Sequence, residues 1–199
     1  MADSNKRIEK TTAIFFSIAV NKNQTMNFTI EKSIEILERT PAVLDAMLRD
    51  ISADWTENNE GGDTWSVFDV LGHLIHGEKT DWMERMEIIL SDAPDKKFAP
   101  FDRFAQFEES RGKTLRELLE EFKGLRKKNV DVVRSKKLTT ENLEQKGVHP
   151  AFGEVTLKQL LATWTVHDLD HISQISRVMA KQYKEAVGPW TQYLKVLNS

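Results

Sequence analysis

The chain has 199 residues and no cysteine, and its 28 lysine and arginine residues nearly balance its 31 aspartate and glutamate residues. The length suits one domain with a substantial core, and the balanced charge gives no electrostatic basis for nucleic acid as a main partner. Without cysteine there is no disulfide framework or thiolate site, so any metal chemistry depends on His, Asp and Glu, and a cytoplasmic protein fits best. No apolar run has the length that a membrane span needs, so we expect no membrane partner.

The first 25 residues are expected to form an extension outside the folded domain, which we place at 26–199. Basic residues followed by an apolar stretch at 13–20 faintly resemble a signal peptide. We favour another interpretation, in which translation starts at Met26, directly before the first helical pattern. Residues 1–25 would then be an upstream or disordered addition.

Four long segments repeat apolar residues at spacings of three and four, which is typical of amphipathic helices. They cover residues 29–51, 66–90, 114–136 and 156–187. Pro41 is expected to bend or interrupt the first, and Ser66, Thr114 and Thr156 are suited to cap the starts of the other three. No segment alternates convincingly at period two. The pattern therefore predicts an all-α four-helix bundle, in which each helix buries one apolar stripe.

The connections at 91–113 and 139–154 are long for a compact domain and favour a crossover topology over a series of simple hairpins. The first contains phenylalanines at a strict spacing of three: Phe98, Phe101, Phe104 and Phe107. Because rings of this size are expected to be buried, they either anchor the connection to the outside of the bundle or form a wall of a pocket above a site. At that spacing they cannot all face one side of a helix, so we expect at least one to line the pocket.

Two of the five histidines, His167 and His171, lie four residues apart and project from one face of the last helix. That face carries the apolar stripe, and paired buried imidazoles need a partner for their lone pairs, which a divalent metal provides. His73, on the stripe of the second helix, is the best third ligand, although His76 could compete with it. His149 is expected to be an ordinary, partly exposed residue.

The residues around these histidines resemble the DinB superfamily of DinB/YfiT-like metalloenzymes. The resemblance covers about Phe28 to Lys195 and is carried by Trp65-Ser66-Val67, Gly72-His73-Leu74-Ile75-His76-Gly77-Glu78, Asp81-Trp82, and Trp164 with His167 and His171. The individual motifs are short, but their order and spacing together are fairly specific.

The resemblance implies an up-down-down-up four-helix bundle, a divalent metal held by three histidines, and often a homodimer. Carried over to this sequence, the ligands are His73, His167 and His171. Characterised members include thiol-dependent S-transferases and a mycothiol-dependent isomerase, in which the metal activates a low-molecular-weight thiol. Many members have no known activity, and the identity of the small-molecule substrate does not carry over.

Two hypotheses follow. In the first, the chain is an enzyme: a metal on three neutral imidazoles keeps its full charge and lowers the pKa of a bound water or thiol, for transfer to a small molecule or for its hydrolysis. Zinc, nickel, iron or copper would suit such a site. In the second, it is a non-catalytic, metal-binding dimeric bundle with a stress-linked binding or interaction role. Glu78, Asp168 and the basic run 126–128 are expected on solvated helix surfaces.

Overall fold

The computed structural model describes residues 25–198. Its longer helices are α1 (Ile30–Leu48), α2 (Val67–Thr80), α3 (Trp82–Leu90), α5 (Leu115–Ser135) and α7 (Leu157–Lys181). The shorter elements are η1 (Ala53–Trp55), α4 (Ala105–Glu109), α6 (Thr140–Leu143), β1 (Lys146–His149), β2 (Gly153–Thr156), α8 (Lys184–Val187), η2 (Gly188–Tyr193) and η3 (Lys195–Leu197). The expected extension at 1–25 falls, apart from Thr25, outside the described residues, so its separation from the domain stays a prediction.

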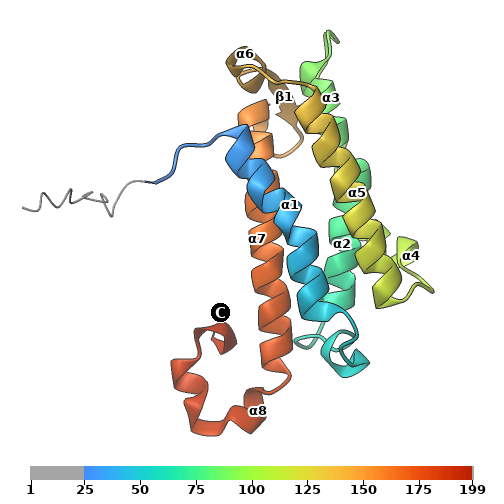
Figure 1. The fold of residues 1–199 in the computed structure, drawn as a ribbon, viewed down its shortest axis with the longest axis vertical. Helices are drawn as coiled ribbons and strands as arrows, with labels where there is room; N and C mark the ends of the chain where they lie inside the picture. The colour runs from blue at the N-terminus through green and yellow to red at the C-terminus, as the bar shows by residue number, and fades with distance from the viewer. Residues whose placement is uncertain (1–24, 199) are drawn as a thin grey trace, which may run out of the picture.

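The helices form a four-helix bundle in the up-down-down-up order (Figure 1), which confirms the predicted fold class. α1 runs toward one end of the bundle, α2 and α3 return, α5 runs in the same direction as α2, and α7 runs back. Both α1 and α2 pack against α5 and α7. The connection from α3 to α5 must therefore travel back along the bundle, and it carries α4, which packs on α2.

The predicted helix starts are confirmed. Ser66, Thr114 and Thr156 each accept a hydrogen bond from the backbone N–H three residues on, and each closes a capping box. α1 continues through Pro41 without ending there.

The helix expected at 66–90 is two helices, because the chain leaves helical geometry at Asp81, with φ −117° and ψ −72°. The break lets the Trp82 indole lie against Gly77, where an added Cβ would be 3.2 Å from its Nε1 atom. Trp82 also stacks on Trp164 of α7, with ring centroids 5.9 Å apart. Aromatic packing at this point accounts for the break.

A small antiparallel hairpin, which the sequence pattern did not predict, precedes α7. Its register runs from Lys146 opposite Thr156 to His149 opposite Gly153. Each strand has four residues, too few for an alternating pattern to be recognised. Gly153 has φ +71°, a conformation that favours glycine.

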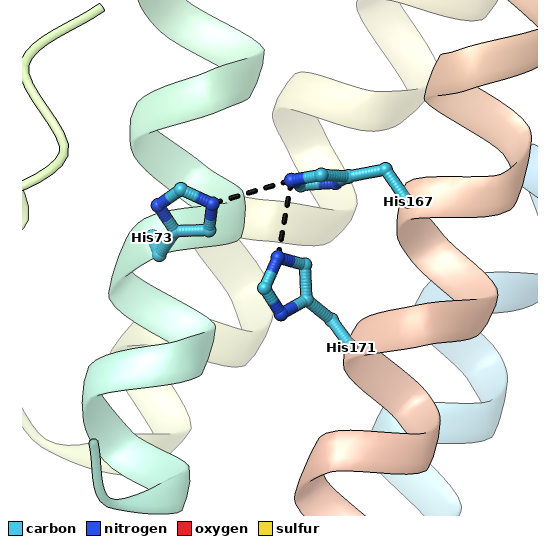
Figure 2. Close-up of side chains that lie close together, drawn as sticks. All are labelled: His73, His167 and His171. Carbon is cyan, nitrogen blue, oxygen red and sulfur yellow. Dashed lines mark hydrogen bonds between the residues drawn. The ribbon is translucent and has the colours of Figure 1, made fainter. Parts of the chain in front are cut away.

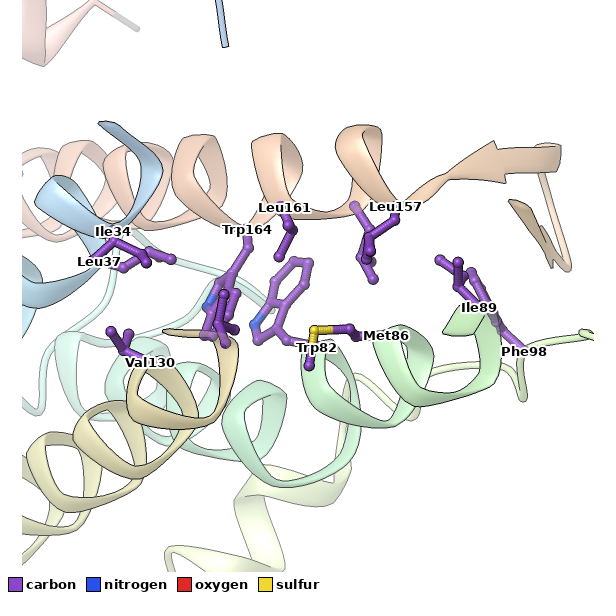
Figure 3. Close-up of a cluster of buried hydrophobic side chains, with 12 residues drawn as sticks. Ile34, Leu37, Trp82, Met86, Ile89, Phe98, Val130, Leu157, Leu161 and Trp164 are labelled. Atoms are coloured by element: carbon purple, nitrogen blue, oxygen red, sulfur yellow. The ribbon is translucent and has the colours of Figure 1, made fainter. Parts of the chain in front are cut away.

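The apolar core is divided into two clusters by a layer of buried polar residues. One cluster surrounds Trp82 and Trp164 near the hairpin (Figure 3), and the other surrounds Leu71 and Phe122. Between them, along the four helices, lie the buried side chains of Thr40, His76, Glu78, Arg126, Asn129 and Asp168. The candidate site lies at this level. None of the described helices is long and apolar enough to cross a membrane.

Candidate metal centre

Three histidine side chains meet between α2 and α7 (Figure 2). The Nε2 atom of His167 lies 3.2 Å from Nε2 of His73 and 3.1 Å from Nε2 of His171. One ligand atom from each ring can be chosen so that all three lie within 4.8 Å of one another. His73 and His171 are buried and His167 is half-buried. The structure thus brings together the three residues that the sequence singled out.

The spacing of these nitrogen atoms fits a divalent metal. Nitrogen ligands 2.0 to 2.1 Å from a tetrahedral zinc ion lie about 3.4 Å from each other, close to the two Nε2 distances given above. The Nδ1 atom of His171 is 2.7 Å from the Gln174 amide oxygen, which can only accept a hydrogen bond. Nδ1 of His171 therefore carries the proton, and the Nε2 lone pair faces the cluster, as metal ligation requires.

The three imidazoles are held in their neutral form. Burial, reinforced by repulsion from neighbouring histidines, lowers the pKa of His73 to about 3 and that of His167 to about 2. Burial also lowers the pKa of His171. Neutral imidazole is the form that ligates metals, so the site needs no deprotonation at neutral pH. Nδ1 of His73 and of His167 are buried without a hydrogen-bond partner among the described residues.

Aromatic rings enclose the cluster. Trp65 and Phe101 pack on His73 with centroid distances of 4.9 and 5.5 Å, and Trp82 packs on His167 at 5.1 Å. The cluster opens onto a cavity of about 470 Å³, whose lining adds Asp81, Arg85, Arg103, His149, Phe152 and Asp170. A bound metal would therefore face a space large enough for a small molecule.

Among residues 25–198, no fourth protein ligand closes the site. His76, the competing candidate for third ligand, is buried, and its Nδ1 atom lies 2.8 Å from Oε1 of Glu109. His149 lies on β1, stacks on Phe152 at 4.5 Å and lines the cavity outside the cluster. The carboxylate of Glu78 lies in the polar layer, where it accepts a hydrogen bond from Arg126. An open position is the arrangement typical of catalytic rather than structural metal sites.

The polar layer beside the cluster contradicts the expected surface positions of Glu78, Asp168 and Arg126. Arg126 is 1% exposed, and its guanidinium donates to Glu78 Oε1 at 2.8 Å and to Asp168 Oδ1 at 2.9 Å. Trp164 Nε1 donates to the same Glu78 oxygen at 2.9 Å, and the Asn129 amide donates to Glu78 Oε2 at 2.9 Å. Burial would lower the pKa of Arg126, but the two carboxylates outweigh it and raise that pKa.

The spacing of these residues could have revealed their burial. Arg126 lies four residues after Phe122 and four before Val130, both buried on α5. Asp168 likewise lies four residues after buried Trp164. A charged residue within an apolar stripe is ordinarily buried only with partners of opposite charge. Arg126, Glu78 and Asp168 lie on three different helices, so the sequence did not show that they pair with one another.

Among the phenylalanines of the long connection, one anchors the connection to the bundle and another forms part of the pocket wall, so each of the two interpretations holds for one ring. Phe98 is buried and anchors the connection in the core, whereas Phe101 packs on both His73 and His76. Phe104 and Phe107 are 61% and 40% exposed, so the expectation that all four rings are buried was wrong. Phe101 lines the cavity, as predicted for at least one of them.

The fold and the three-histidine cluster define a helical-bundle protein with the side chains of a metal centre, and the comparisons agree. A family model for the DinB superfamily matches residues 36–175. The chain belongs to the DinB superfamily. No curated protein matches it significantly. A similar solved structure is YfiT from Bacillus subtilis, described as a probable metal-dependent hydrolase with an unusual four-helix bundle topology. It has a TM-score of 0.65 and 20% identity, and the match covers 82% of this chain and 92% of YfiT.

Proposed function

We propose that the protein is a metal-dependent enzyme that binds one divalent ion through His73, His167 and His171 and activates a water or a low-molecular-weight thiol. The observation that carries the proposal is the convergence of three neutral imidazoles at the wall of an open cavity. Membership of the DinB superfamily and the description of YfiT as a probable metal-dependent hydrolase support it. The reaction is hydrolysis of a small molecule or transfer of the thiol to it.

A bound metal supplies positive charge that lowers the pKa of a coordinated water or thiol toward neutrality. The residues around the ion would preserve its charge, exclude water and accept a proton. Neutral histidines leave the charge of the ion undiminished, and the rings of Trp65, Trp82 and Phe101 exclude bulk water from one side. Asp81 lines the same cavity, and burial raises its pKa, which suits its carboxylate to accept a proton.

Zinc and nickel are our first candidates for the metal, with iron next, because imidazole ligands suit all three. The open cavity favours turnover over the alternative of a metal-binding bundle with a purely structural site. Homodimer formation and a cytoplasmic location stay predictions.

The test begins with metal analysis of the purified protein. Cobalt is then substituted for the native ion, and its visible spectrum is followed during titration with a small thiol such as 2-mercaptoethanol. Hydrolytic turnover is screened in parallel with ester and amide substrates.

We expect about one metal ion per chain and either a spectral change with thiol or hydrolysis. His73→Ala should lose the bound metal and this activity, and His149→Ala should bind metal normally. A protein that binds no metal stoichiometrically would contradict the proposal.

A further inference from the structure

Four charged side chains line the cavity beside the three histidines, and two of them neutralise each other. Asp81 Oδ1 accepts a hydrogen bond from Arg85 Nε at 2.7 Å, and both side chains are nearly buried. Arg85 also lies over the Phe98 ring, 5.3 Å from its centroid. This arginine is fixed by its partners and has little freedom to meet a ligand.

Arg103 differs from Arg85. It lies on the connection between α3 and α4, is exposed, and within residues 25–198 the structure gives its guanidinium no ion pair or hydrogen bond. It lines both the cavity and an adjoining hollow of about 410 Å³ beside Trp65. Arg103 shares the lining of the cavity with His73, His167 and His171. An unpaired arginine thus lies beside the candidate metal centre.

The fourth charged residue, Asp170, lies on the α7 side of the cavity next to His171. Its negative charge acts on His171 and on Arg177, and Arg177 itself is held by Glu60 at 2.8 and 3.0 Å. A divalent ion bound by the three histidines would add positive charge to the same cavity and so would also favour an anion. Arg103 therefore remains the group best placed to bind an anion at the mouth of the cavity.

We infer that Arg103 anchors an anionic group of the substrate, which is accordingly a small molecule with an apolar body and a carboxylate or comparable oxyanion at one end. The guanidinium fork pairs with two oxygens of such a group. Trp65, Phe101 and the exposed ring of Phe152 provide apolar surface for the body. This inference rests on the proposed function and specifies its substrate class.

The experiment compares two ligands of nearly equal shape, benzenesulfonate and the uncharged methyl phenyl sulfone. A sulfonate coordinates metals weakly, so its binding reports on the cavity rather than on the ion. Affinities are measured by calorimetry and by the change in tryptophan fluorescence, since Trp65 and Trp82 line the cavity, with the protein zinc-loaded and again after chelation. We use wild type, Arg103→Gln and the control Arg111→Gln, whose arginine follows α4, pairs with Glu108 and lies outside the cavity lining.

Wild type should bind the sulfonate about tenfold more tightly than the sulfone, the value of one charge-assisted contact. Arg103→Gln should reduce this preference to near one while leaving sulfone binding unchanged, and Arg111→Gln should keep it. The preference should persist after chelation, which separates this inference from the question of metal-dependent turnover. Equal binding of both ligands by wild type, no binding of either, a preference that survives Arg103→Gln, or one that disappears with the metal would each overturn the inference.

Discussion

Asp168 directly follows His167 in α7, yet its carboxylate is fully buried and bound by Arg126 of α5. Neighbouring residues on a helix point about 100° apart, so this ion pair fixes the rotation of α7 while His167 faces the cavity. On α2, which carries His73, Glu78 is likewise bound by Arg126, and this ion pair fixes the rotation of α2. The buried pairs thus hold the two ligand-bearing helices in a defined relation.

Replacing Arg126 should destabilise the protein strongly. Arg126→Ala would leave two buried carboxylates without their counter-charge, which costs about 3 to 5 kcal/mol of unfolding free energy. Urea denaturation measures this loss. The matched control is Lys127→Ala, which removes an exposed ion pair with Asp131 and should change stability by less than about 0.5 kcal/mol. Similar midpoints for the two variants would show that the buried network contributes little.

Metal affinity should depend on each of the three clustered histidines. Because loss of a residue that only supports a ligand weakens metal binding about 10-fold to 100-fold, His167→Ala should lower zinc affinity by at least about 100-fold. Competition with a chromophoric chelator gives the constant. His149→Ala is the control, since this residue lines the cavity outside the cluster. Unchanged zinc affinity in His167→Ala would remove that residue from the ligand set.

The metal-free protein should lose stability as the pH falls below about 6.5, the ordinary pKa of histidine. In the unfolded chain His73 and His167 then become protonated, whereas in the folded chain they stay neutral, because their pKa values there are about 3 and about 2. Unfolding free energy therefore rises with pH across this window, with a slope that approaches about 1.4 kcal/mol per pH unit for each such histidine.

Urea denaturation at pH 6, 5.5 and 5 measures that slope. His73→Asn should reduce it by about 1.4 kcal/mol per pH unit, the share of one titrating group. His149→Asn should reduce it less, because burial is the main cause of the lowered pKa of His149 and this side chain is less buried than His73. An unchanged slope in His73→Asn would show that this imidazole is protonated normally in the fold.

The phenylalanines of the long connection should separate stability from ligand binding. Phe98→Ala removes a ring that is 5% exposed and should cost about 3 to 5 kcal/mol. Phe104→Ala removes a ring that is 61% exposed and should cost little. Phe101→Ala should instead weaken the binding of benzenesulfonate more than it lowers stability. A uniform loss of stability with unchanged affinity would exclude the connection from the site.

Periodic patterns predicted the helices and singled out the histidine pair of the last helix, because both depend on local spacing. His167 and His171 are one turn apart in any helix, and Ser66, Thr114 and Thr156 cap helices through contacts only three residues away. The break at Asp81 was not predictable in this way. It depends on the stacking of Trp82 and Trp164, residues 82 positions apart in sequence.

The same limit applies to the site. The three histidines stand out as residue types on apolar stripes, whereas the position of Arg103 and Asp170 at the same cavity emerges only once the connection and α7 are placed around it. Arg126 was assigned to the surface because it begins a run of three basic residues, and only Lys127 and Lys128 of that run are exposed. The helical phase relative to Phe122 outweighs that local composition.

The connection before α4 and the hairpin before α7 share backbone hydrogen bonds. Phe98 N–H donates to the Val148 carbonyl at 2.9 Å, and Val148 N–H donates to the Lys96 carbonyl at 2.9 Å. At Gly147 an added Cβ would lie 2.5 Å from the Phe98 ring, so the strand and the connection are in close contact. One segment leads into the Arg103 wall of the cavity and the other into the Phe152 wall. Moving one of these walls without the other would break these two hydrogen bonds, so parts of the chain about fifty residues apart set the shape of the cavity jointly.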